Sequence, residues 1–357
     1  MTDWRDQPID LRDGDALDIA ALQRYLQDHF SFPVQNLHVR QYPSGFSNLT
    51  YEIGWDDTRW ILRRPPPGAN VKSGHDMARE FKILDGLSPL YPQVPAPHLY
   101  CDDPSVIGAP FYMMEQVEGV ILRAGMPAAM HPSPALMTQI AAQFIRTLAE
   151  VHAIDYNAAG LADLGKPAGY IDRQVSGWIK RYGKATTDDI PAMDAIGKWL
   201  QENMPTNQSA ALIHNDFKYD NVVLDPADWT QIIGILDWEM ATLGDPMMDL
   251  GTTLGYWVTD DDPPAMQALK LSPTTLPGNP SRSTLANWYA AATGTSLDHL
   301  VFYYAFGLFK IAGIVQQIYA RYKQGHTKDP RFANLIHAVR ACSQMAWQAI
   351  QTNQIDP

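Results

Sequence analysis

A short block of polar residues lies between two apolar runs in the second half of the chain. It contains His214, Asn215 and Asp216, has Asn221 five residues after Asp216, and is followed by an apolar run that ends at Asp237. Phosphoryl transfer needs a carboxylate that accepts the proton of a hydroxyl, and oxygen ligands that hold Mg²⁺ against nucleotide phosphates. Each residue alone is explained as well by a turn cap. The set together predicts Asp216 as the base, and Asn221 and Asp237 as metal ligands.

The elements that must position this block change in type along the chain. Strands are expected at 37–40, 50–53, 59–63 and 106–117, with a hairpin turn at 54–58 and helices within 1–35 and at 74–87. Helices are expected at 135–153, 171–183, 191–203, 284–293, 296–323 and 330–352, with short β runs at 211–213, 222–224 and 231–236. This order predicts a strand-rich lobe over 1–117 and a helical lobe over 118–357, with a ligand site at their junction.

Composition narrows the class of protein. Of the 357 residues 46% are hydrophobic, which is typical of a globular chain. The net charge of −12 is unfavourable for nucleic-acid binding. Only Cys101 and Cys342 are present, and the N-terminus lacks a signal-peptide pattern, so a cytoplasmic location is expected. The apolar stretch 300–319 contains a lysine and two glutamines, which indicates a core helix and not a membrane span.

The catalytic block, together with the segment 244–250 (GDPMMDL), resembles the aminoglycoside phosphotransferase and choline kinase group. A closer resemblance is to the phosphotransferase domain that some acyl-CoA dehydrogenases carry. It rests on the segments 44–50 (SGFSNLT), 62–66 (LRRPP), 79–81 (REF) and 114–115 (ME). The resemblance covers about 30–330. It implies an α+β, protein-kinase-like bilobal fold and a phosphotransferase that uses ATP and Mg²⁺.

The resemblance also implies a nucleotide site in the first lobe. The loop that covers the nucleotide would comprise Ser44, Gly45, Phe46, Ser47 and Asn48. Arg63 would bind the α- and β-phosphates where the wider family has lysine, since strand alternation and the following prolines favour it over Arg64. Glu80 would pair with Arg63, and adenine would contact the Glu115 carbonyl and the Val117 amide.

Two other acidic residues have different expected roles. Asp249 is expected to hold the backbone of the catalytic loop and not the metal, whereas Glu239 could approach the metal or be structural. The chain has no Ala-Pro-Glu segment and no long loop after Asp237, so protein-kinase activity is not expected.

The charge of the last 94 residues bears on the acceptor. Residues 264–357 contain eight basic and three acidic residues, a net charge of +5, whereas an aminoglycoside site needs several carboxylates. The count favours an anionic acceptor such as a hydroxy acid or a hydroxyacyl thioester, although bases that only solubilise helices would give the same count. Lys310 is either an internally paired lysine or a substrate contact. The aromatic residues of this lobe could form a choline cage but are better explained as core.

Two alternatives to a small-molecule kinase stay open. One is a pseudokinase that binds a nucleotide or metabolite as a sensor, favoured by Arg63 and by the short nucleotide loop. The other is a partner module of an acyl-CoA dehydrogenase. The retention of Asp216, Asn221 and Asp237 favours the kinase.

Overall fold

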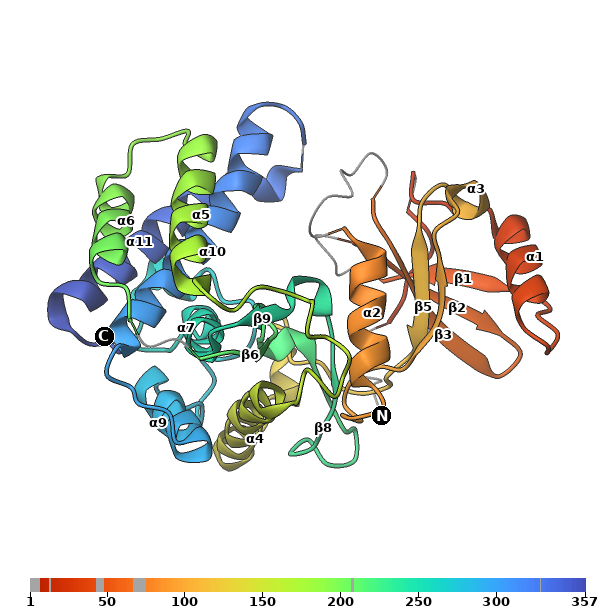
Figure 1. The fold of residues 1–357 in the computed structure, drawn as a ribbon, viewed down its shortest axis with the longest axis horizontal. Helices are drawn as coiled ribbons and strands as arrows, with labels where there is room; N and C mark the ends of the chain where they lie inside the picture. Colours follow the sequence, from red (N-terminus) through yellow and green to blue (C-terminus); the bar gives the residue numbers. More distant parts are fainter. Residues whose placement is uncertain (1–6, 13, 43–47, 67–74, 207–208, 328) are drawn as a thin grey trace. The chain divides into compact units, whose positions relative to one another are not determined.

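The computed structural model describes residues 7–12, 14–42, 48–66, 75–206, 209–327 and 329–357. By their contacts these residues form two compact units (Figure 1). Unit 1 comprises Met1–Ile121 and Val222–Met240, and unit 2 comprises Leu122–Asn221 and Ala241–Pro357. The division into 1–117 and 118–357 stays a prediction. The contacts add that 222–240 pack with the first part of the chain.

Unit 1 is built on a five-stranded antiparallel sheet in the order β1-β2-β3-β5-β4. The strands are β1 (His38–Gln41), β2 (Leu49–Trp55), β3 (Thr58–Arg64), β4 (Pro97–Cys101) and β5 (Phe111–Glu115). The β2–β3 hairpin turns at Asp56, whose φ of 47° is one that aspartate tolerates in tight turns. This turn fixes the register that places Arg63 opposite Thr50.

Helices cover the sheet, and a second hairpin completes unit 1. Helix α2 (Met77–Leu87) is capped by Asp76 and contacts β4 and β5. Helices α1 (Ile19–His29) and α3 (Pro104–Ile107) contact each other, and α1 buries Leu22 and Leu26 in a core shared with the strands. Strands β7 (Val222–Leu224) and β8 (Ile232–Ile235) pair, and the short helix η3 (Trp238–Met240) follows them. Residue Asp237 lies at the start of η3, directly after this hairpin.

Unit 2 is mostly helical. It contains η1 (Ala128–Met130), α4 (Pro134–Ala153), α5 (Tyr170–Ala185), α6 (Pro191–Glu202), η2 (Tyr219–Asn221), α7 (Pro246–Tyr256), α8 (Pro264–Gln267), α9 (Arg282–Thr293), α10 (Leu300–Lys323), η4 (Pro330–Phe332) and α11 (Leu335–Thr352). Strands β6 (Ala211–Ile213) and β9 (Thr242–Gly244) pair beside them. Helix α10 is central, because it packs against α5, α6, α7 and α11 (Figure 1).

Close packing of α10 depends on glycine. A β-carbon at Gly251 of α7 would lie 2.2 Å from the Tyr303 carbonyl oxygen, and one at Gly307 would lie 2.2 Å from the Gly251 carbonyl oxygen. The two backbones therefore touch, as only glycine permits. Within the described part of the chain, α10 is also the one helix long and apolar enough to cross a membrane, but 67% of its apolar window is buried, as in a core helix.

The structure corrects several expected elements. Residues 106–110 are not strand, because Asp103 caps a helix that has Pro104 in its first turn, and β5 starts only at Phe111. Strands β4 and β9 and helix α7 were not expected. Helix α10 starts at Leu300 and not at 296, and 330–352 divides into η4 and α11.

Candidate active site

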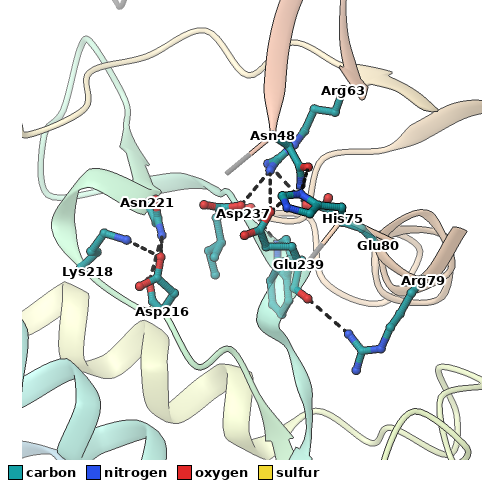
Figure 2. A network of polar contacts seen from close by, with 12 residues as sticks. Asn48, Arg63, His75, Arg79, Glu80, Asp216, Lys218, Asn221, Asp237 and Glu239 are labelled. Carbon is teal, nitrogen blue, oxygen red and sulfur yellow. Dashed lines mark hydrogen bonds and ion pairs between the residues drawn. The ribbon is translucent and has the colours of Figure 1, made fainter. Parts of the chain in front are cut away.

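Arg63 is the centre of a charged cluster in unit 1. Its side chain, at the end of β3, is 9% exposed and meets three carboxylates (Figure 2). Nη1 lies 3.3 Å from Oε1 of Glu80, while Nη2 donates to Oδ1 of Asp237 at 2.9 Å and lies 3.3 Å from Oε2 of Glu239. The predicted Arg63–Glu80 pair is present. Arg64 points elsewhere, since its Nη1 donates to the Ile107 carbonyl at 2.7 Å, as strand alternation requires.

The neighbouring charges act on the pKa of Glu80. The Glu80 side chain is 1% exposed, and burial is the largest cause of a rise in its pKa. Arg63 lowers the pKa of Glu80 and Asp237 raises it, and the net result is a raised pKa. Burial favours the neutral form of a carboxyl group, and neighbouring negative charge does the same. Arg79 also interacts with Glu80, whose charge opposes the effect of burial on the pKa of Arg79.

Backbone conformation brings Asp237 to this cluster. The residue follows β8 and has a φ of 68°, in the left-handed region that aspartate tolerates better than most residues. The chain then turns into η3, which contacts α2. Two residues far apart in sequence, Asp237 and Glu80, thereby share one arginine.

A chain of hydrogen bonds extends from Arg63 to Asn48, the last residue of the expected nucleotide loop, and on to His75. Oε2 of Glu239 accepts from Nδ2 of Asn48 at 2.6 Å, and Oδ1 of Asn48 lies 2.8 Å from Nδ1 of His75 (Figure 2). His75 therefore donates from Nδ1, because the Asn48 oxygen can only accept. Sequence reasoning gave His75 no role and left Glu239 open. The remaining loop members, Ser44, Gly45, Phe46 and Ser47, lie outside the described residues.

The expected adenine hinge packs on the second hairpin of unit 1. Glu115 ends β5, and its amide donates to the Ala96 carbonyl at 2.9 Å. A β-carbon at Gly234 of β8 would lie 2.8 Å from Cγ1 of Val117, and Val120 bridges to Leu224 of β7. The hinge and the strand that leads to Asp237 are thus in contact. Adenine binding by Glu115 and Val117 stays a prediction.

Asp216 is the centre of a separate cluster in unit 2. Its Oδ2 accepts from Nδ2 of Asn221 at 2.9 Å and from Nζ of Lys218 (Figure 2). The Asn221 amide also donates to the Asp216 carbonyl at 2.9 Å, while the Lys218 ammonium lies 5.3 Å from the centre of the Tyr256 ring. Lys218 was not assigned a role from the sequence. A cation two residues after the candidate base was the available signal.

The loop that carries Asp216 is held by Asp249, as expected. The carboxylate of Asp249 accepts the backbone amides of His214 at 2.7 Å and Asn215 at 2.8 Å. It also meets Nε2 of His152 at 3.1 Å. Burial alone would raise the pKa of Asp249, but His152, His214 and Lys310 together outweigh burial and lower it. The expected contact of Asp249 with the loop backbone is therefore present, and the absence of a metal-binding role stays a prediction.

Two bases of the last 94 residues are engaged inside unit 2. Lys310, 2% exposed, donates to the Asn215 carbonyl at 2.8 Å and lies 3.2 Å from its Oδ1. Arg282, which is fully buried, forms a bidentate pair with Asp262. Lys310 is thus internally bonded. The other bases of the segment carry the rest of its positive charge.

The candidate metal ligands suit a magnesium ion that keeps much of its water. No group of three His, Cys, Asp or Glu side chains within the described ranges could hold a metal. Mg²⁺ is commonly bound by one or two carboxylates plus water and phosphate oxygens. The Asn221 amide nitrogen donates twice to Asp216, which leaves its oxygen as the ligand atom. The carboxylate of Asp237 and the oxygen of Asn221 are donors of the right chemistry.

Comparison with known proteins shows the family of the chain. The model of the Phosphotransferase enzyme family matches residues 38–278, more than half of the chain. The chain belongs to this family. The α+β, kinase-like fold that the sequence predicted is confirmed by the structural neighbours of the chain.

Similar proteins are known in sequence and in structure. Human acyl-CoA dehydrogenase family member 11 is 36% identical over 330 residues, 89% of this chain and 42% of the relative. The chain thus spans less than half the length of that relative. A provisionally named aminoglycoside phosphotransferase from Ralstonia eutropha JMP134 has a TM-score of 0.79 and 30% identity, covering 94% of this chain and 99% of that one.

A more distant structure shows the fold alone. Aminoglycoside phosphotransferase APH(4)-Ia, in a ternary complex with AMP-PNP and hygromycin B, has a TM-score of 0.58 and 14% identity. The alignment covers 92% of this chain and 98% of that chain. The family of phosphotransferases therefore shares the fold of this chain across large differences in sequence.

Proposed function

We propose that this phosphotransferase is an ATP- and Mg²⁺-dependent kinase that transfers the γ-phosphoryl group to a hydroxyl of a small metabolite. The observation that carries the proposal is the Asp216 carboxylate, which Lys218 and Asn221 hold on a loop fixed by Asp249. A base in phosphoryl transfer must be held in place by other groups, and this carboxylate is. The AMP-PNP complex of APH(4)-Ia supports a nucleotide as donor.

Residues of unit 1 would bind the nucleotide. In the proposal Arg63 binds phosphate oxygens through its guanidinium, which offers two parallel donors. Glu80 keeps Arg63 in place, and the 115–117 segment receives the adenine. Mg²⁺ would be held by Asp237 and Asn221, and when bound it neutralises charge on the phosphates. The presence of Asp237 among the three carboxylates that meet Arg63 supports the binding of a cation close to the phosphates.

Asp216 would carry out the proton transfer. Its carboxylate orients the acceptor hydroxyl and accepts its proton as the hydroxyl oxygen bonds to the γ-phosphorus and the bond to the ADP oxygen breaks. Lys218 and Asn221 fix the direction of the carboxylate. Asp249 would have no contact with the reactants in this proposal, since both its oxygens bind the loop or His152.

The acceptor in this proposal is an anionic hydroxy acid or a hydroxyacyl-CoA. Exposed bases of the last helices, Arg321, Lys323 and Arg340, support an anion, even after Lys310 and Arg282 are removed from the count. The naming of the curated relatives as acyl-CoA dehydrogenases supports an acyl-CoA compound or an acyl-CoA dehydrogenase as partner. Choline is less well supported, because Trp257, Tyr303 and Tyr304 are core residues.

The test is an ATP-consumption screen with Mg²⁺ present. The panel would compare hydroxy acids and hydroxyacyl-CoA esters with choline, sugars and kanamycin, and would use Asp216→Asn as the control. Turnover on an anionic hydroxy compound, absent in the control, supports the proposal. Thermal stabilisation by ATP with no consumption on any acceptor would favour the alternative, a nucleotide-binding sensor. Co-purification with an acyl-CoA dehydrogenase would favour the partner module.

A further inference from the structure

Lys310 is a buried lysine that the proposed reaction does not use. It lies in the middle of α10 and is 2% exposed. Burying an ammonium group is costly unless it is hydrogen-bonded or paired with opposite charge. Both described acceptors of Lys310 belong to one residue, Asn215, whose carbonyl and side-chain oxygens lie 2.8 and 3.2 Å from Nζ.

Asn215 has a backbone conformation that needs support. Its φ is 67°, in the left-handed region that asparagine populates more readily than most residues. It directly precedes Asp216, so its backbone angles set the direction from which the catalytic carboxylate leaves the loop. Its side chain lies 3.3 Å from the Tyr170 hydroxyl as well as near Lys310. The side chain is therefore fixed from two directions.

Two helices hold opposite sides of the same peptide segment. From α7, Asp249 accepts the amides of His214 and Asn215; from α10, Lys310 donates to the Asn215 carbonyl. The contact of α7 with α10 at Gly251 and Gly307 brings these two helices together. The segment before Asp216 thus has an anionic acceptor on its amides and a cationic donor on its carbonyl.

We propose that Lys310 is a positioning residue for Asp216: through Asn215 it holds the left-handed turn that aims the catalytic carboxylate. This inference rests on the proposed function for its consequence in turnover, but its structural part does not. Burial alone would lower the pKa of Lys310, and Asp249 and Asp216 oppose this, with a resulting pKa of about 8. Lys218 and Arg181 are the cations that act in the same direction as burial.

The experiment compares Lys310→Met with a matched control on the same helix. Gln316→Leu also removes a buried polar group from α10. The side-chain amide of Gln316 donates to the Ala185 carbonyl at 2.8 Å, away from the Asp216 loop. Hydrogen exchange of the peptide that spans 213–219 measures the loop without any turnover. Hydrolysis of MgATP, with water as the acceptor, measures kcat and KM.

For Lys310→Met we expect exchange in 213–219 to rise about tenfold. We expect kcat to fall about 100-fold with KM for MgATP within about twofold, because misplacement of the base acts on the chemical step. Gln316→Leu should leave both values as in the wild type. Unchanged exchange in Lys310→Met, or an equal rise in both variants, would overturn the proposal. Wild-type protein without hydrolysis or acceptor turnover would contradict the proposed function alone.

Asn215 provides a second series if Lys310→Met does not fold. Asn215→Gly keeps a residue that adopts the left-handed conformation freely but removes the side-chain acceptor. Asn215→Ala removes the acceptor and adds a conformational penalty. We expect kcat to fall about threefold in Asn215→Gly and about 30-fold in Asn215→Ala. Equal losses of kcat in the two variants would show that Lys310 does not act by supporting the left-handed conformation of Asn215.

Discussion

One carboxylate oxygen of Glu239 is shared by Arg63 and Asn48. Nη2 of Arg63 lies 3.3 Å from Oε2 of Glu239, and Nδ2 of Asn48 donates to the same oxygen at 2.6 Å. Asn48 in turn binds His75. Glu239 therefore connects the expected phosphate-binding arginine with Asn48, the last residue of the expected nucleotide loop, as a hydrogen-bond acceptor within unit 1.

If Glu239 acts as a hydrogen-bond acceptor, the shape of its side chain should matter more for MgATP binding than its negative charge. Glu239→Gln keeps an oxygen for Arg63 and Asn48, so the Kd for MgATP should change by less than about threefold. Glu239→Ala removes the acceptor of the buried Asn48 amide and one of the three carboxylates that meet Arg63, and the Kd should rise about tenfold. Isothermal titration calorimetry checks both variants. Equal losses would instead indicate that Glu239 acts through its charge, as a metal ligand would.

The hinge depends on Gly234. Gly234→Ala places a β-carbon within 2.8 Å of Val117 and 3.1 Å of Val223, both in packed positions. Overpacking of this kind costs about 1–3 kcal/mol in the free energy of unfolding, and displacement of Val117 should raise the KM for ATP. The control is Gly183→Ala in α5, where a β-carbon meets nothing within 4 Å. A KM unchanged by Gly234→Ala would remove Val117 from the adenine site.

The lowered pKa of Lys310 predicts that the free energy of unfolding depends on pH. Its pKa is about 8 in the folded chain against an ordinary value of 10.5, because burial disfavours the ammonium. Between these values the unfolded chain binds more protons, so stability from this group rises with pH. Wild-type protein should therefore gain free energy of unfolding relative to Lys310→Met from pH 8 to pH 10.5. Urea unfolding at several pH values measures the difference; a constant or falling difference contradicts the assignment.

Local patterns explain which elements could be predicted. The β2–β3 hairpin combines alternating apolar residues with a two-residue turn at Asp56, and α4 carries a long apolar stripe, so both were expected close to their bounds. The α3 helix was missed, although Asp103 and Pro104 are a start signal, because four residues give no periodicity. Helix α7 was missed because it is buried on all sides and has no polar face.

In the site, too, residues in local motifs could be predicted, whereas contacts from distant elements could not. Motif spacing predicted roles for Asp216, Asn221 and Asp237, and these roles stay predictions. The resemblance led to the Arg63–Glu80 pair and to the contact of Asp249 with the loop backbone, and both are present. Partners that come from distant elements could not be predicted from spacing. His75 reaches Asn48 across 27 positions, and Lys310 reaches Asn215 across 95. Such contacts follow only from tertiary packing.

The most direct test of the central claim, that Asp216 is the base of a phosphotransferase, is a comparison of kcat and nucleotide affinity in Asp216→Asn. The substitution keeps the size of the side chain and the Asn221 contact but cannot accept a proton from the acceptor. We expect kcat to fall about 10³-fold while the Kd for MgATP stays within about threefold. Lys218→Met, which keeps the carboxylate, should lose less. Full turnover by Asp216→Asn would contradict the account.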